Sequence, residues 1–127
     1  MNHSPRRPNL QVEYLPPSQL RPNPRNARRH SRRQINKLAK LIEGFGSTVP
    51  IASDETGTIL AGHARFEAAI QLGLAEVPCI RLSDLSEPEK LAFLLADNRV
   101  GEESTFDDSA TKGILIELTG LEFDTSL

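Results

Sequence analysis

The amino-acid sequence predicts a small α/β domain with a short mixed sheet and about four helices. Two candidate strands separated only by the turn at residues 54–57 indicate an antiparallel hairpin. A helical pattern at 63–72 lies between the second of these strands and another apolar run at 77–82, and such a crossover places its two strands parallel. A chain of 127 residues is long enough for one hydrophobic core but not for two.

The N-terminal third is basic and largely irregular. Residues 1–11 are predicted to form a flexible basic tail, residues 12–15 a short strand, and the proline-containing stretch 20–30 an extended segment. Residues 1–40 hold ten Lys and Arg and one acid, whereas residues 41–127 hold five and sixteen. This asymmetry is typical either of a face that binds nucleic acid or phosphate, or of a solvated basic arm.

The first helix is predicted to begin after Ser31. Ser31 and Gln34 have the spacing of a capping box, in which each side chain satisfies a free backbone N–H. Gly44 and Gly46 are expected to end the helix. Its predicted buried face consists of apolar residues at helical spacing: Ile35, Leu38, Ala39, Ile42 and Phe45.

Strands are predicted at 49–52 and 58–61, and Gly62 joins the second strand to the helix at 63–72. After the strand at 77–82, a second capping box starts a helix that runs from residue 86 to about residue 99. A last helix is predicted from residue 107 or 108. Its shared face consists of Ala110, Ile114, Leu115 and Leu118.

These elements define one domain at residues 12–119, followed by a tail or the start of a linker at 120–127. No apolar run approaches the roughly 18 residues of a membrane helix, and the basic N-terminus lacks the apolar segment of a secretory signal. Cys79 is the single cysteine, so no internal disulfide exists, and its apolar neighbours predict core packing. We therefore expect a cytoplasmic protein without membrane contact.

The strand–glycine–helix turn at residues 59–69 carries the clearest indication of function. Backbone N–H groups in the first turn of a helix lack partners, and the helix dipole adds positive charge there. Gly62 lets a phosphate approach this backbone, and Arg65 can add a charge-assisted contact. The alternative is that glycine only lets the chain turn.

A second candidate position lies in the helix that follows residue 86. Leu91, Leu94, Leu95 and Asn98 fall at i, i+3, i+4 and i+7. Asn98 therefore continues an apolar stripe and is predicted to point inward, where a polar side chain needs a partner. The alternative is a helix C-cap.

Residues 62–68 resemble the nucleotide-binding motif Gly-Glu-Arg-Arg-x-Arg-Ala of ParB-type N-terminal domains. Gly62, Arg65 and Ala68 match this motif, whereas other residues replace its second, third and sixth positions. Residues 20–31 are similar to the Asn-Pro-containing first box of the family, and residues 96–99 stand where its Glu-Asn-rich second motif lies. On this basis the chain is identified as a member of the ParB/sulfiredoxin-like superfamily.

This resemblance implies a compact nucleotide-binding fold that takes CTP or ATP with Mg²⁺. It implies phosphate contacts from the turn and a covering arginine from the first box, the candidates being Gly62, His63, Arg65 and Asn98, with Arg25 or Arg28. It also implies Mg²⁺ near Asp97 and Asn98. His63 and Glu102 are the candidates for a catalytic role. Sulfiredoxins place a reactive cysteine at the position of His63, so sulfiredoxin activity is not expected.

The predicted function is therefore nucleotide binding in a DNA-related process, and the sequence leaves open whether an NTPase or phosphotransferase activity accompanies it. The alternative is a non-enzymatic DNA-binding or adaptor module that uses the basic residues 21–40. A nuclease, the family's common label, is disfavoured because no acidic cluster has the spacing of a metal site. A homodimer or a covalently linked partner domain is a further possible arrangement.

Overall fold

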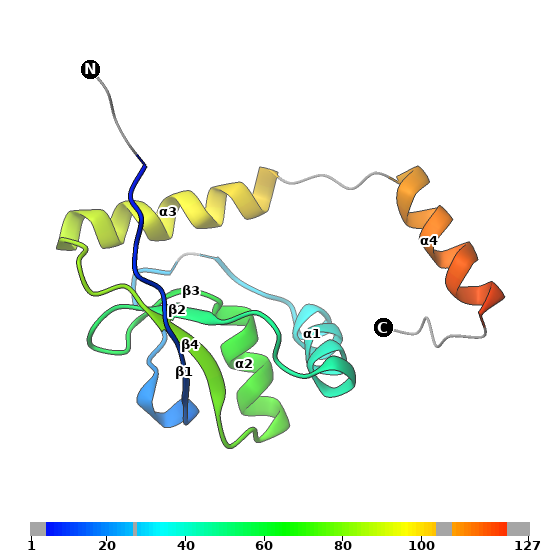
Figure 1. Cartoon of the computed structure of the whole chain (residues 1–127), viewed down its shortest axis with the longest axis horizontal. Helices are drawn as coiled ribbons and strands as arrows, with labels where there is room; N and C mark the ends of the chain where they lie inside the picture. The colour runs from blue at the N-terminus through cyan, green and yellow to red at the C-terminus, as the bar shows by residue number, and fades with distance from the viewer. Residues whose placement is uncertain (1–4, 27, 104–107, 122–127) are drawn as a thin grey trace.

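The computed structural model describes residues 5–26, 28–103 and 108–121, and at 101–103 and 108 it describes the backbone alone. One four-stranded sheet lies against helix α2 (His63–Leu72), which packs in turn on helix α1 (Arg32–Phe45), and helix α3 (Glu87–Glu103) lies beside the sheet (Figure 1). With helix α4 (Asp108–Gly120), these elements confirm the predicted α/β fold.

The strand order in the sheet is β1-β4-β2-β3, where β1 is Val12–Leu15, β2 Ile51–Ser53, β3 Ile59–Ala61 and β4 Val77–Arg81. Strands β2 and β3 form the predicted antiparallel hairpin. The expectation that the two strands joined by α2 are parallel is wrong, because β4 pairs with β2 rather than with β3. Strand β4 lies parallel to β2 and therefore runs opposite to β3, which stays at the edge of the sheet. Strand β1 pairs antiparallel with β4. The expected start of β2 at residue 49 is wrong, because pairing begins only after Pro50, which has no N–H to donate.

The capping box at the start of α1 is confirmed. The Ser31 hydroxyl accepts the Gln34 N–H, and the Gln34 side chain accepts the Ser31 N–H, each at 3.1 Å. Phe45, predicted to be buried, is 56% exposed. It is the last residue of the helix and lies almost one turn beyond Ile42, the last residue of α1 that is buried against α2.

The core has two parts. The first fills the space between the sheet and α2 and contains Leu20, Ile51, Ile59, Ala69, Val77 and Cys79; the second joins α1 to α2 through Ile35, Ala39, Ile42 and Ala68. Cys79 is fully buried, which confirms its predicted packing role. Burial raises the pKa of its thiol, so the unreactive protonated form is favoured.

Helix α3 is longer than predicted and buries less of its apolar stripe. It continues to Glu103 rather than ending near Arg99. Leu94 is buried, but Leu91 and Leu95 are 44% and 61% exposed, because α3 meets the sheet mainly at strand β3. The predicted stripe therefore overestimates how much of this helix is covered.

The predicted apolar face of α4 does not pack on the rest of the domain. Ile114 and Leu115 are 58% and 44% exposed, and α4 stands apart from the sheet in Figure 1. Helical spacing identified a common face, but no other described element covers it. Among the described residues, no helix is long and apolar enough to cross a membrane.

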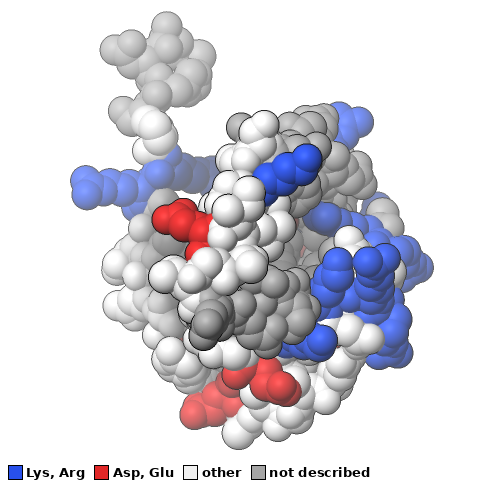
Figure 2. Space-filling view, turned by 90° about the vertical axis from the view of Figure 1, so that its right-hand side faces the viewer, with Lys and Arg blue, Asp and Glu red and all other residues white. Residues whose placement is uncertain are grey.

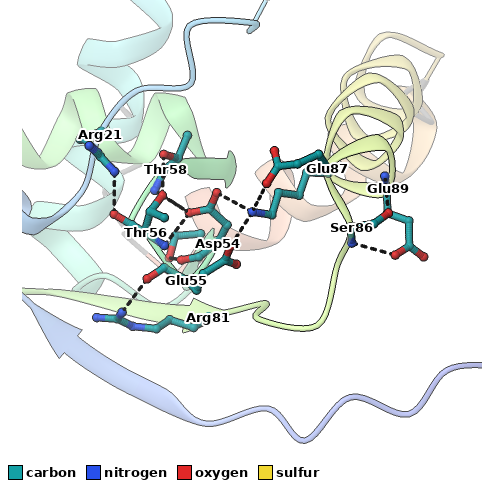
Figure 3. A network of polar contacts seen from close by, with 11 residues as sticks. Arg21, Asp54, Glu55, Thr56, Thr58, Arg81, Ser86, Glu87 and Glu89 are labelled. Atoms are coloured by element: carbon teal, nitrogen blue, oxygen red, sulfur yellow. Dashed lines mark hydrogen bonds and ion pairs between the residues drawn. The ribbon is translucent and has the colours of Figure 1, made fainter.

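A buried ion pair ties the turn between β2 and β3 to the start of α3 (Figure 3). Lys90 Nζ lies 3.2 Å from Asp54 Oδ2, and each side chain is only 9% exposed. The other carboxylate oxygen of Asp54 accepts the N–H groups of Thr56 and Thr58 at 2.9 and 3.0 Å. These contacts fix the first turns of α3 relative to the sheet.

Candidate functional site

The predicted turn from β3 into α2 is present, and it requires glycine. Gly62 has φ of +98°, a left-handed conformation that other residues adopt only with strain. A Cβ added there would lie 3.3 Å from the Cα and Cγ1 of Ile51 in the core. Glycine is therefore required at this position by the packing of the turn against Ile51, independently of any ligand.

The first turn of α2 presents backbone donors and a charged side chain. Phe66 is the first residue of the helix whose N–H bonds within it, to the Gly62 carbonyl at 3.0 Å. The N–H groups of residues 63–65 are therefore available at the positive end of the helix dipole. Arg65 is half-buried, and burial lowers the pKa of its guanidinium, which nevertheless stays charged at neutral pH.

A cavity of about 400 Å³ lies in front of this turn. It collects six predicted site residues from the loop before α1, from α2 and from α3: Arg28, Gly62, His63, Arg65, Asp97 and Asn98. Arg25 does not line this cavity; it lines a neighbouring cavity with Asp54 and Lys90 and a smaller one with Asn98. The side chain of Glu102 lies outside the described residues, so its predicted role stays a prediction.

Two further residues line the cavity that sequence reasoning did not assign. Asn26 accepts a hydrogen bond from Asn98 Nδ2 through its Oδ1, at 3.2 Å. Asn98 is half-buried, so the expectation that it needs a polar partner is confirmed. The C-cap alternative is wrong because α3 continues past it. His30 reaches the same cavity as His63, although 33 positions separate them in the sequence.

The charges around the cavity favour an anion accompanied by a cation. Arg28, Arg65 and the start of α2 contribute positive charge, and Asp97 contributes an exposed carboxylate. His63 Nε2 accepts the N–H of Asn23 at 3.1 Å. Burial lowers the pKa of His63, as does the nearby His30, and together they outweigh the opposite effect of Asp97, so the neutral ring is favoured.

The oxygen atoms that the cavity offers would suit Mg²⁺ only if a bound ligand supplied further oxygen atoms. No group of three or more His, Cys, Asp or Glu side chains in the described part of the chain could hold a metal ion. Mg²⁺ commonly keeps several waters and takes one or two protein oxygens plus substrate phosphates. The Asp97 carboxylate and the Asn98 Oδ1 would fit that role.

A separate basic surface covers the exposed side of α1. Figure 2 shows Lys and Arg side chains gathered along one side of the molecule. On α1, the exposed residues Arg33, Lys37 and Lys40 follow helical spacing and therefore form a continuous stripe, which we call the α1 basic stripe.

Relatives of known sequence share most of this domain. Residues 2–99 match the family described as the ParB N-terminal domain. The ParB-like nuclease domain-containing protein YnaK of Escherichia coli is 43% identical over 81 residues, which are 64% of this chain and 93% of YnaK. The chromosome-partitioning protein Spo0J of Thermus thermophilus is 34% identical over 72% of this chain, but the match spans only 35% of Spo0J.

Solved structures show the same fold. ParB from Caulobacter crescentus in complex with CTP-γ-S superposes with a TM-score of 0.69 and 23% identity, covering 87% of this chain and 65% of that one. Sulfiredoxin from Arabidopsis thaliana gives a TM-score of 0.55 and 24% identity over 67% of this chain and 97% of that one. These solved structures show that the chain shares its fold with ParB and with sulfiredoxin. The match over residues 2–99 and the identity with YnaK show that the chain belongs to the ParB N-terminal domain family.

Proposed function

We propose that this domain binds a nucleoside triphosphate, CTP or ATP, together with Mg²⁺ in the cavity at the start of α2. One observation carries the proposal: polar groups from three separate segments, Arg28, the first turn of α2 and Asn98, converge on one cavity. The bound CTP-γ-S of the Caulobacter crescentus relative supports it by analogy. In this arrangement the helix start and the two arginines would hold the phosphates, and Asp97 and Asn98 would hold Mg²⁺.

Turnover, by hydrolysis or phosphoryl transfer, is a separate step of the proposal. His63 lines the cavity, but its Nε2 already accepts a hydrogen bond from Asn23. Glu102 remains a candidate on the strength of the sequence alone. The geometry therefore supports binding more strongly than catalysis.

Arg65→Ala is expected to weaken triphosphate binding about ten- to a hundredfold, because a charge-assisted hydrogen bond contributes about 1.5–3 kcal/mol. Calorimetric titration of CTP, ATP and GTP, each with Mg²⁺, measures this directly. Arg33→Ala is the matched control, since Arg33 is exposed on α1 and outside the cavity. If the wild type binds none of the three at millimolar concentration, or if folded Arg65→Ala binds as tightly, the proposal is wrong.

A second candidate function, DNA binding, is favoured by the α1 basic stripe (Arg33, Lys37 and Lys40). Phe, Tyr and Trp are missing from residues 21–40, so strong base stacking is not expected there. Contacts of this kind go to phosphates and carry little sequence information. The chain spans only about a third of Spo0J, so DNA contacts of full-length partition proteins are not transferred to it.

Replacing all three residues of the α1 basic stripe by Gln should reduce duplex affinity and its salt dependence. Three lost phosphate contacts should lower the slope of log affinity against log salt by about 3. Fluorescence anisotropy with two unrelated duplexes, across a salt series, provides the measurement, and Lys112→Gln on α4 is the control. Tight, sequence-specific and salt-insensitive binding would contradict this function for the stripe.

A further inference from the structure

The turn formed by residues 23–26 has a shape fixed by its own hydrogen bonds. The Asn26 N–H donates to the Asn23 carbonyl at 3.0 Å, which closes the turn. The Arg25 N–H donates to the Asn23 Oδ1 at 3.0 Å. This short segment can therefore be positioned as a unit by contacts made at its ends.

Each end of the turn is held by a different helix. At the first end, the Asn23 N–H donates to Nε2 of His63, the first residue of α2, at 3.1 Å. At the other end, Asn98 of α3 donates its Nδ2 hydrogen to Asn26 Oδ1 at 3.2 Å. The turn thus bridges two walls of the cavity through one hydrogen bond at each end.

The contact with Asn23 determines the state of the His63 ring. A nitrogen that accepts a backbone N–H carries no proton, so the neutral ring has its hydrogen on Nδ1. Burial, which lowers the pKa of His63, favours the same neutral form. For Nε2 to act as a general base, it would first have to lose the Asn23 N–H.

We infer that His63 is a positioning residue, whose Nε2 holds the Asn23 N–H and thereby keeps the 23–26 turn and the following Arg28 at the cavity. Arg28 lies two residues beyond the end of the turn and lines the cavity. The imidazole is well suited to this task, because it offers an acceptor from the first position of a helix, where backbone groups are donors. The effect on nucleotide affinity rests on the proposed function, whereas the hydrogen bond does not.

Two substitutions separate positioning from the alternatives. His63→Phe keeps a planar ring but removes the acceptor. His63→Gln keeps an acceptor, because the Gln side-chain oxygen reaches about as far from the backbone as Nε2 does. His30→Phe is the matched control, since His30 lines the same cavity but does not hold the Asn23 N–H.

The first measurement is amide hydrogen exchange at Asn23, followed by NMR on the nucleotide-free protein. Exchange should be about five- to tenfold faster in His63→Phe, the factor that corresponds to one ordinary hydrogen bond. It should remain near the wild-type rate in His63→Gln and His30→Phe. If Asn23 exchanges equally fast in the wild type and in folded His63→Phe, the inference is wrong.

The second measurement is titration with CTP and ATP in the presence of Mg²⁺. His63→Phe should weaken binding several-fold, and His63→Gln should restore it to within about threefold of the wild type, a difference of about 0.7 kcal/mol. Equal loss in both variants with normal Asn23 exchange in His63→Gln would overturn the positioning role in favour of direct contact with the ligand. A wild type that binds no nucleotide would refute the proposed function, and the exchange experiment would still decide the hydrogen bond.

Discussion

Asp54→Ala is expected to lower the free energy of unfolding by about 2–4 kcal/mol, because it leaves two backbone N–H groups without their acceptor and removes one carboxylate from a buried ammonium. The substitution removes one of three carboxylates around the Lys90 ammonium, whose side chain is 9% exposed, while Glu55 at 2.7 Å and Glu87 at 3.0 Å remain. It also removes the acceptor of the Thr56 and Thr58 N–H groups. Since a small domain has only about 5–15 kcal/mol of stability in total, this single change should remove a large part of it.

Urea denaturation followed by circular dichroism measures this loss. Asp84→Ala is the control, because Asp84 is an exposed aspartate that makes none of the contacts around Asp54 and Lys90, and exposed substitutions usually change stability by less than about 0.5 kcal/mol. Unfolding midpoints that coincide for Asp54→Ala and the wild type would show that the ion pair contributes nothing.

The pKa of Asp54 predicts the direction in which the free energy of unfolding depends on pH. Burial is the largest single influence on the pKa of Asp54 and raises it, but hydrogen bonds from Thr56, Thr58 and Lys90 together outweigh burial. The folded-state pKa therefore lies below its ordinary value of 3.8. A depressed folded-state pKa stabilises the domain above the unfolded value, and this contribution disappears as the pH falls through the folded value. The stability difference between the wild type and Asp54→Ala should accordingly shrink only below about pH 4.

Local patterns predicted the elements of this fold well, because capping and turn chemistry act over three or four residues. Both capping boxes, Ser31 with Gln34 and Ser86 with Glu89, form the predicted hydrogen bonds. The same patterns failed to predict burial, because burial depends on segments that are distant in the sequence. Leu95 and Ile114 lie on faces with helical spacing, yet nothing described covers them.

The candidate site was predictable where a motif is continuous in sequence and unpredictable where it is assembled in space. Gly62 and Arg65 belong to one strand–helix turn and were found directly. The sequence offered Arg25 and Arg28 as equal choices, and the structure places Arg28, but not Arg25, among the residues that line the cavity. The ion pair of Asp54 with Lys90 joins residues 36 positions apart, with no local signal to connect them.

Replacement of Gly62 is the other substitution for which we expect a large loss of stability. The loss has its origin in the backbone conformation of the turn and in its contact with the core. A non-glycine residue in the left-handed conformation costs roughly 1–2 kcal/mol. In addition, a side chain at this position would press on Ile51, whose Cα and Cγ1 would lie 3.3 Å from the new Cβ. Overpacking of a tight core site typically costs about 1–3 kcal/mol more.

Gly62→Val is therefore expected to lower the free energy of unfolding by about 2–5 kcal/mol and to disturb the first turn of α2 in whatever fraction stays folded. Gly73→Val separates the two causes, because Gly73 also has a positive φ, +66°, but a Cβ there would meet nothing within 4 Å. Urea unfolding of both variants should show the larger loss at Gly62, and the difference measures the crowding against Ile51. Equal losses would mean that backbone strain alone determines the need for glycine. In that case any additional loss of nucleotide binding by folded Gly62→Val would have to come from the ligand side of the turn.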